Sequence, residues 1–337
     1  MKLHTSSALL PLLAFALGFA LNAPNARAVE IVAHRGASYD APFDTLAAEQ
    51  LAWEQKADVV ANNIRLTADG KIIVTHDSNL KRVTGRNLVV ENTTFDELRT
   101  LDAGAWKSPR FAGEKLPALD EQLALIPPGK RMFVEIKAGP EIAPELARCL
   151  ERNKAGGHNV TFISFDYKTL KAVREKMPGV PILYIVSYKK PAAPKPAAKA
   201  ADKAGDKAVD KDKAADKTAA QAKAGAAPKD EATAKAKSGE AAATKTETKT
   251  KGWNYPARQP ATLDEAIARA KDAGFDGLDL QNTWPLDEAD VRKIKDAGLQ
   301  LHVWTINDPD EARRWIALGA TSITTDRPGW LREKLGL

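Results

Sequence analysis

The stretch Asp58–Asp77 reads DVVANNIRLTADGKIIVTHD, and it decides how the strands of this chain can be arranged. Two β-rich runs, DVVANNIRL (Asp58–Leu66) and KIIVTHD (Lys71–Asp77), are separated only by the residues TADG. A parallel crossover needs about a dozen residues or more, so these two runs cannot be parallel neighbours. We therefore expect an antiparallel hairpin that turns at Asp69-Gly70, a dipeptide typical of tight hairpin turns.

Short β-rich runs alternate with helical patterns along the rest of the chain, which is typical of a parallel sheet with crossover helices. The expected strands are EIVAHRG, DVVANNIRL, KIIVTHD, RMFVEIK, NVTFISF, VPILYIVS, FDGLDLQ, LQLHVWTI and ATSITTD. The expected helices are Thr45–Glu54, Leu119–Leu125, Ile142–Asn153, Tyr167–Lys176, Leu263–Ala273, Glu288–Ala297 and Pro309–Leu318. Without the hairpin arm, the parallel strands have the number of a (β/α)8 TIM barrel in the α/β class. A doubly wound open sheet is the alternative.

The first 28 residues have the features of a secretory signal. An apolar run over Ala8–Leu21 follows Lys2, and the segment ends in Ala-Arg-Ala at Ala28, a small-x-small cleavage pattern. The apolar run is shorter than the roughly 20 residues that a membrane-spanning helix needs. We therefore predict cleavage of this signal peptide and export to the periplasm or the medium, with no transmembrane segment in the mature chain. An uncleaved anchor is the alternative.

A Lys/Ala-rich segment, residues 189–252, interrupts the barrel pattern. It holds 16 lysines against 9 acidic residues and contains no aromatic residue. This composition buries too little apolar surface to offset the loss of chain entropy, so we predict a disordered linker. The whole chain carries a net charge of +6. The linker contributes a net seven positive charges and Lys2 and Arg27 of the signal contribute two, so the rest of the chain carries −3. The linker is either an inert spacer or a cationic contact to an anionic surface, and nucleic acid is not the expected partner.

Two histidines, His34 in VAHRGAS and His76 in VTHDSN, each follow an apolar β run at its C-terminal end. The carboxyl ends of barrel strands carry the reactive groups in this architecture, so the two residues are candidates for a general acid and a general base. The other histidines of the mature chain are expected elsewhere, with His158 in a solvated loop and His302 packed within a strand.

Glu135 and Lys137, in FVEIKAG, lie two residues apart on an expected strand. Their side chains therefore point to the same side of that strand. Burying an acid and a base costs free energy unless the two charges are paired or used. The two residues form either a structural ion pair or part of a site that holds a metal ion and a phosphate.

The order of these motifs resembles that of the glycerophosphodiester phosphodiesterase family. The matching stretches are AHRGAS from Ala33, LTADGKIIVTHDSNLKRVTGR from Leu66, LDAGAWKSPRFAGEKLPALDE from Leu101, VEIK from Val134, ISFD from Ile163, GLDLQ from Gly277, HVWTIND from His302 and TTDRP from Thr324. They span nearly all of the mature chain except the Lys/Ala-rich linker. The resemblance implies a TIM barrel of the phospholipase C-like phosphodiesterase type, formed by residues 29–188 and 253–337. It also implies a small family insertion at 79–115, after the hairpin.

The resemblance further implies an activity and a set of site residues. The family hydrolyses glycerol phosphodiesters to glycerol phosphate and an alcohol, with one divalent cation, Ca²⁺ or Mg²⁺. His34 and His76 fall on the positions of its acid and base. Arg35 and Lys137 fall on the positions that hold the phosphate, and Trp304 matches an aromatic residue near the glycerol.

The metal ligands of the family are altered in this chain. Where the resemblance implies Glu-x-Asp, the second strand reads Ala-Asn-Asn over Ala61–Asn63, whereas the third ligand, Glu135, is present. Upstream, the family's Pro-Glu-Asn-Thr reads Pro-Phe-Asp-Thr at 42–45. Affinity for hard cations follows the charge of their oxygen ligands, so we expect weak cation binding with Asn63 as a weak ligand. Asp44 could turn inward and supply a replacement carboxylate.

Three functions are compatible with these residues. The first is an exported glycerophosphodiester phosphodiesterase whose activity is weak because two of three metal carboxylates, at positions 61 and 63, are replaced. The second is a non-catalytic exported protein that binds phosphodiester or polyol phosphate head groups. The third is a phospholipase C-like enzyme that uses the two histidines without a metal ion.

Overall fold

The computed structural model describes residues 29–154, 159–190 and 258–337. Apart from Lys190, the described residues belong to one unit. Three predicted features lie outside the described residues and stay predictions: the signal peptide at 1–28, the loop with His158, and the linker 189–252 except its first two residues. None of the helices in the described ranges is long and apolar enough to cross a membrane.

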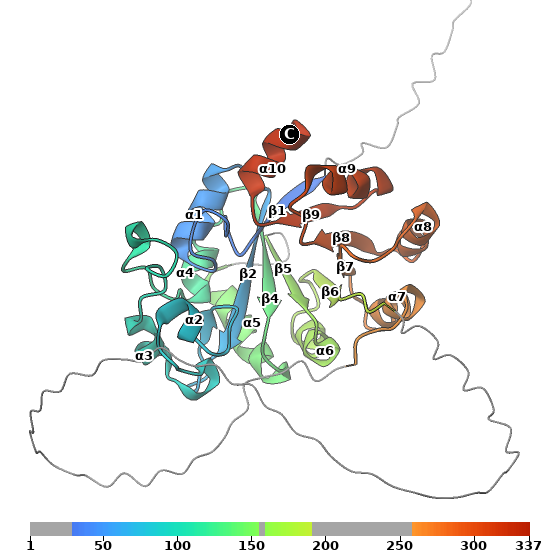
Figure 1. Ribbon diagram of the computed structural model, residues 1–337. Helices are drawn as coiled ribbons and strands as arrows, with labels where there is room; N and C mark the ends of the chain where they lie inside the picture. Colours follow the sequence, from blue (N-terminus) through green and yellow to red (C-terminus); the bar gives the residue numbers. More distant parts are fainter. Residues whose placement is uncertain (1–28, 155–158, 191–257) are drawn as a thin grey trace, which may run out of the picture. The chain divides into compact units, whose positions relative to one another are not determined.

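The described residues contain nine β-strands, and every strand expected from the sequence is present. They are β1 (Glu30–His34), β2 (Val59–Leu66), β3 (Ile72–Val74), β4 (Arg131–Ile136), β5 (Val160–Ser164), β6 (Ile182–Val186), β7 (Gly277–Gln281), β8 (Gln300–Trp304) and β9 (Ser322–Thr325). Their order is β1-β9-β8-β7-β6-β5-β4-β2-β3, and a further parallel pairing between β1 and β2 closes the ring. Figure 1 shows these strands at the centre of a ring of helices. The predicted eight-stranded barrel is confirmed, and the alternative of an open doubly wound sheet is wrong.

The hairpin between β2 and β3 forms as the short TADG connection predicts. Ile64 pairs with Val74 and Leu66 with Ile72 in antiparallel register, and Gly70 in the turn has a φ of +73°. Glycine adopts this left-handed conformation more readily than residues with a side chain. β3 pairs with the end of β2, beyond the part of β2 that pairs with β1. The hairpin therefore extends past the carboxyl end of the barrel and carries the residues after β3 to its mouth.

The helices of the described ranges follow the strands in the expected alternation. They are α1 (Leu46–Glu54), α2 (Lys81–Thr84), α3 (Phe95–Thr100), α4 (Leu119–Leu123), α5 (Ala143–Arg152), α6 (Tyr167–Lys176), α7 (Leu263–Asp272), α8 (Glu288–Asp296), α9 (Pro309–Leu318) and α10 (Pro328–Leu335), with 3₁₀ helices η1 (Val90–Asn92), η2 (Pro109–Phe111) and η3 (Pro140–Ile142). Side-chain N-caps fix the starts of several, at Thr45, Asp166, Thr262, Asp287 and Asp308. The sequence does not predict α2, α3 and α10, which have four, six and eight residues. Such short helices barely show a 3.6-residue period.

The insertion at 79–115 has a small apolar core of its own beside β3. Its buried members, packed with Ile73 of β3 and with Leu116, are Leu80, Val83, Val90, Leu98, Leu101 and Ala103. Phe43, from the turn between β1 and α1, packs against the same cluster. The insertion is therefore fixed to the barrel, and its charged side chains have defined places at the barrel mouth.

The interior of the barrel is closed below the mouth by packed side chains. Phe133 and the ring of His302 meet edge to face with their centres 5.5 Å apart. His302 is buried, with Nδ1 2.7 Å from Ser322 Oγ and Nε2 3.0 Å from Gln300 Oε1. Burial lowers the pKa of His302 to about 3, so the ring is neutral. His302 is thus a packed barrel residue, as the sequence predicts.

Glu49 of α1 makes the stability of the fold depend on pH. Its carboxyl group is buried and accepts one hydrogen bond, from Trp53 Nε1 at 3.3 Å. Burial raises the pKa of Glu49 from 4.5 to about 8. The native state therefore binds more protons than the unfolded state over this range, and the free energy of unfolding falls as the pH rises through it.

Glu49→Gln is expected to remove this loss of stability at high pH, because the amide cannot ionise. Relative to the unchanged protein, its free energy of unfolding should rise by up to about 3 kcal/mol between pH 5 and pH 8. Urea unfolding of both proteins at the two pH values measures the difference. The same pH dependence in both proteins would contradict the assignment.

Candidate active site

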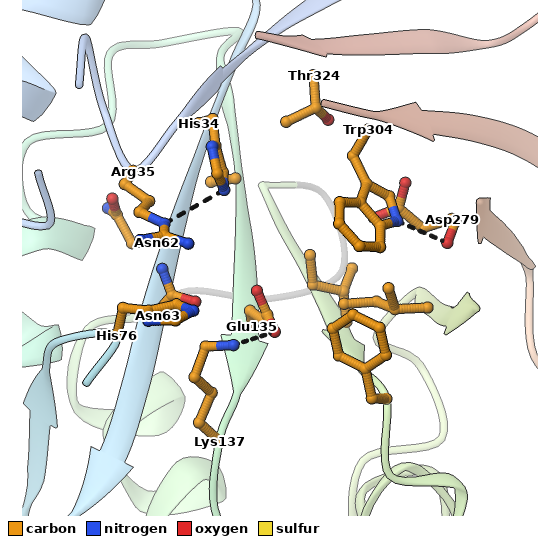
Figure 2. Close-up of a pocket in the computed structure, with 14 residues that line it drawn as sticks. His34, Arg35, Asn62, Asn63, His76, Glu135, Lys137, Asp279, Trp304 and Thr324 are labelled. Carbon is orange, nitrogen blue, oxygen red and sulfur yellow. Dashed lines mark hydrogen bonds and ion pairs between the residues drawn. The ribbon is translucent and has the colours of Figure 1, made fainter. Parts of the chain in front are cut away.

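The carboxyl ends of the barrel strands surround a cavity of about 300 Å³, shown in Figure 2. Most of the residues singled out in the sequence line it, namely His34, Arg35, Ala61, Asn63, His76, Glu135, Lys137 and Trp304. They come from β1, β2, β4, β8 and the segment after β3, so closure of the barrel brings together residues from both ends of the chain. Asp44 is buried and is not among the residues that line the cavity.

His34 ends β1, and an acid from the far end of the chain orients its ring. Its Nδ1 lies 2.7 Å from Asp326 Oδ1. Asp326 also accepts hydrogen bonds from Ser38 Oγ at 3.1 Å and from Asn307 Nδ2 at 2.7 Å. Burial opposes ionisation of Asp326, but these bonds prevail and hold its pKa well below the usual range. The other ring nitrogen of His34, Nε2, accepts a hydrogen bond from Arg35 Nε at 3.2 Å.

The turn after β1 places Arg35 at the mouth of the cavity. Arg35 has a φ of +59° and Gly36 a φ of +79°, so the chain turns sharply directly after His34. A Cβ atom on Gly36 would lie 2.5 Å from the backbone carbon of Ala48 in α1. Glycine is therefore required where this turn meets α1.

His76 follows β3 and is held from two sides. Its Nδ1 lies 2.8 Å from Asp77 Oδ1, and Asp77 in turn accepts a hydrogen bond from Arg82 Nε at 2.8 Å. Arg65 donates to the backbone carbonyl of His76 through Nε at 2.9 Å and Nη2 at 2.8 Å. Burial lowers the pKa of His76, and the positive charge of Lys137 lowers it further. At pH 7 the ring is therefore neutral, and with its Nδ1–H donated to Asp77, its Nε2 can accept a proton.

Glu135 and Lys137 form an ion pair at the end of β4. Lys137 Nζ lies 2.5 Å from Glu135 Oε1 (Figure 2), and their side chains are 3% and 14% exposed. Burial alone would raise the pKa of Glu135, but the ammonium of Lys137 holds it below its usual value. Burial lowers the pKa of Lys137, and the carboxylate of Glu135 counteracts this effect. The carboxylate of Glu135 is thus already engaged by a partner within the protein.

Asp44 and Asn63 form a hydrogen-bonded pair in which acid and amide have exchanged places relative to the pattern described above. Asp44 Oδ1 accepts hydrogen bonds from the backbone nitrogen of Asn63 at 3.1 Å and from its Nδ2 at 3.0 Å. Asp44 adopts a left-handed φ of +61°, which turns its side chain to this contact. The Oδ1 atom of Asn63 is buried and has no hydrogen-bond partner. The acid of the pair therefore lies at position 44, which does not line the cavity, and the amide lies at position 63, which does.

The residues present do not fit the divalent cation that the resemblance implies. Ala61 offers no ligand atom, and Asn63 offers one uncharged oxygen. Glu135 is paired with Lys137, and Asp44 is engaged with Asn63. Throughout the described ranges, no group of three or more His, Cys, Asp or Glu residues is placed to hold a metal ion. A hard cation would meet a single carboxylate beside an ammonium, and such ions are held by clusters of oxygen ligands.

Asp279 of β7 is a cavity residue that the sequence reasoning missed. It is 3% exposed, and its Oδ1 has no hydrogen-bond partner. Burial raises the pKa of Asp279 well above the usual value, and the charge of Glu135 adds to this effect. Trp304 donates through Nε1 to the backbone carbonyl of Asp279 at 3.1 Å (Figure 2), and its ring meets that of Phe165 edge to face with centres 5.6 Å apart. In the sequence, the single acid of the apolar run GLDLQ is the signal that could have identified it. The cavity has a cationic side with Arg35 and Lys137 and an apolar side with Trp304 and Phe165.

Comparison with known proteins identifies the family to which this chain belongs. The sequence profile of the "Glycerophosphoryl diester phosphodiesterase family" matches residues 34–278 and 231–330. The chain belongs to the glycerophosphoryl diester phosphodiesterase family.

Individual relatives match the chain in part. The YhdW protein of Bacillus subtilis is 35% identical over 158 residues, 46% of this chain and 65% of YhdW. A glycerophosphodiester phosphodiesterase of Caldanaerobacter subterraneus is 34% identical over 159 residues, 45% of this chain and 64% of that protein. The chain thus spans less than two thirds of the length of these curated relatives. An Oleispira antarctica phosphodiesterase, solved in complex with the product sn-glycerol-3-phosphate, has a TM-score of 0.65 at 22% identity and covers 91% of this chain and 97% of its own. This likeness confirms the fold.

Proposed function

We propose that this protein hydrolyses glycerol phosphodiesters to glycerol phosphate and an alcohol, slowly and with little dependence on a divalent cation. The observation that carries the proposal is the meeting of two carboxylate-oriented histidines with Arg35 and Lys137 in one cavity. Membership of the family supports the substrate class. The absence of carboxylates at positions 61 and 63 supports a low rate, because a bound cation normally stabilises the charge that develops on phosphorus.

In this proposal the two histidines move protons in opposite directions. A glycerol hydroxyl attacks phosphorus and gives its proton to Nε2 of His76. The bond from phosphorus to the leaving alcohol breaks, and His34 supplies the proton that the alcohol takes away. Asp326 stabilises the imidazolium form of His34. Water then opens the resulting cyclic phosphate with the roles of the histidines reversed.

Arg35 couples phosphate binding to the ability of His34 to transfer a proton. In the free protein its Nε donates to His34 Nε2, the atom that must carry the transferred proton. A phosphate in the cavity offers Arg35 a charged acceptor, which forms a stronger hydrogen bond than a neutral imidazole. Binding of the diester therefore draws Arg35 to the phosphate and frees His34 Nε2 for proton transfer.

Hydrolysis of glycerophosphocholine or glycerophosphoethanolamine tests the proposed function. The assay is run with EDTA and with added Ca²⁺, Mg²⁺ or Mn²⁺. We expect slow turnover that persists in EDTA, because the described residues do not provide a ligand set for a divalent cation. Turnover that appears only with an added cation would contradict the proposed cation independence.

A second candidate is a non-catalytic protein that binds phosphodiester or polyol phosphate head groups. The ion pair of Glu135 with Lys137 favours it, because the cavity retains cationic groups while its one ionised acid is neutralised. A rise in melting temperature with glycerol 3-phosphate, together with no turnover under any condition, would identify this function.

The location and contacts of the protein are also part of the proposal. The sequence of residues 1–28 supports export to the periplasm or the medium. The surplus of lysine in residues 189–252 supports contact with an anionic surface. Any binding of Ca²⁺ or Mg²⁺ is proposed to be weak, with Asn63 and Glu135 as its ligands.

A further inference from the structure

A second cavity of about 390 Å³ adjoins the cavity that holds the histidines. The two share His34 and Arg35. The lining of this outer cavity also includes Phe43, Arg82, Lys107 and Asp326. Because Arg35 lines both cavities, a diester with its phosphate at Arg35 can place one substituent in the inner cavity and the other in the outer one.

Phe43 holds two guanidinium groups at the outer cavity without neutralising them. The Cζ atom of Arg82 lies 4.7 Å from the centre of its ring and that of Arg35 5.4 Å. Both distances lie within the range of a cation–π contact. The resemblance places Glu at this position, where a carboxylate would pair with either guanidinium. Phenylalanine adds no negative charge here, so among the described residues the one ion pair of these two guanidinium groups is that of Arg82 with Asp77.

The two guanidinium groups keep donors for an anion. Arg82 uses Nε for Asp77 at 2.8 Å, and Arg35 uses Nε for His34 at 3.2 Å. Within the described part of the chain, the terminal nitrogens of neither side chain have a hydrogen-bond partner. The side chain of Arg82 is 54% exposed, so these donors are open to the outer cavity.

The remaining charges also favour an anionic ligand. Lys107 Nζ donates to the backbone carbonyl of Ser38 at 2.9 Å, a neutral partner that leaves its positive charge uncompensated. Asp326 is the acid that lines the outer cavity, and its carboxylate is engaged with His34, Ser38 and Asn307. Three cationic side chains therefore face the outer cavity against one acid of its lining, Asp326, and Asp77 behind Arg82, and both acids already have partners.

We propose that the outer cavity binds a second phosphate, carried by the alcohol portion of the diester. This inference rests on the proposed function of the inner cavity and narrows its substrates to diesters whose alcohol is itself phosphorylated. Guanidinium groups suit phosphate oxygens because their fixed donors match them in pairs. A cationic head group such as choline would meet like charge at the same place.

Calorimetric binding of two matched ligands tests this inference, with glycerophosphoglycerol compared to the same compound bearing a terminal phosphate monoester. We expect the phosphorylated ligand to bind at least about tenfold more tightly to the unchanged chain. In the double variant Arg82→Gln, Lys107→Gln the ratio of the two affinities should fall to about one. An effect transmitted only through Asp77 and His76 would weaken both ligands alike and leave the ratio unchanged.

Lys81→Gln is the matched control, because Lys81 is an exposed cation on the same helix, α2, and does not line the outer cavity. This variant should keep the preference. Equal affinities in the unchanged chain, a preference retained by the double variant, or its loss in the control would each overturn the inference. Binding does not require turnover, so an inactive protein would refute the proposed hydrolysis while still reporting on the outer cavity.

Discussion

The triple variant Ala61→Glu, Asn63→Asp, Asp44→Asn is expected to bind Ca²⁺ at least about 100-fold more tightly than the natural chain and to hydrolyse glycerol phosphodiesters at least about 100-fold faster. The first two changes add two carboxylates to the cavity wall beside Glu135. Two further charged oxygen ligands can outweigh the ammonium of Lys137, which now neutralises that side of the cavity. Calcium titration by calorimetry and the rate with and without EDTA measure the two effects.

The change at position 44 is required by the contact between Asp44 and Asn63. With Asn63→Asp alone, two carboxylates would meet where a hydrogen bond of 3.0 Å now joins acid and amide. The double variant that keeps Asp44 should therefore be less stable than the triple variant, by about 1–3 kcal/mol. Asp44→Asn alone adds no ligand and is the control for calcium binding. Equal calcium affinity in the triple variant and the natural chain would show that the altered acids do not limit cation binding.

Replacement of either histidine of the cavity should abolish most of the remaining turnover. His34→Asn and His76→Asn are each expected to lower the rate by about 10²–10⁴-fold, the usual contribution of a positioned acid or base. The loss should appear in EDTA as well, because the proposed proton transfers involve only the two rings. Initial rates at pH 7, together with melting temperatures that show folded protein, make the measurement.

His302→Gln provides the comparison for these variants. His302 lies within the barrel but does not line the cavity, and its ring nitrogens contact Ser322 and Gln300. Its replacement should lower the melting temperature and leave the rate close to that of the natural chain. If His34→Asn and His76→Asn retained the natural rate, the proposed mechanism would be wrong.

The sequence was sufficient to predict the barrel and the meeting of its strand ends. The TADG connection forces a hairpin between β2 and β3, and the count of parallel strands follows from it. Once the ring closes, residues that end separate strands must share one mouth. His34, His76 and Glu135 therefore lie in one cavity, although their strands are far apart in the sequence.

Contacts between loops could not be predicted in the same way. Asp44 reaches Asn63 only because its backbone adopts a left-handed φ of +61°, which residues other than glycine seldom do. The sequence suggests that Asp44 could turn inward, but the partner it meets depends on that single torsion angle. The contact of Arg82 with Phe43 likewise depends on how the insertion packs on β3. Periodicity describes neither of these contacts.

The pairing of β1 with the last strand, β9, makes the candidate active site a late product of protein synthesis. His34 emerges from the ribosome early, whereas Asp326, which fixes the orientation of its ring, follows 292 residues later. A nascent chain that lacks β9 has an open barrel edge and a first histidine without its carboxylate. Premature termination before Ser322 would therefore leave the barrel without β9 and His34 without Asp326, even though nearly every other group of the cavity has already been translated.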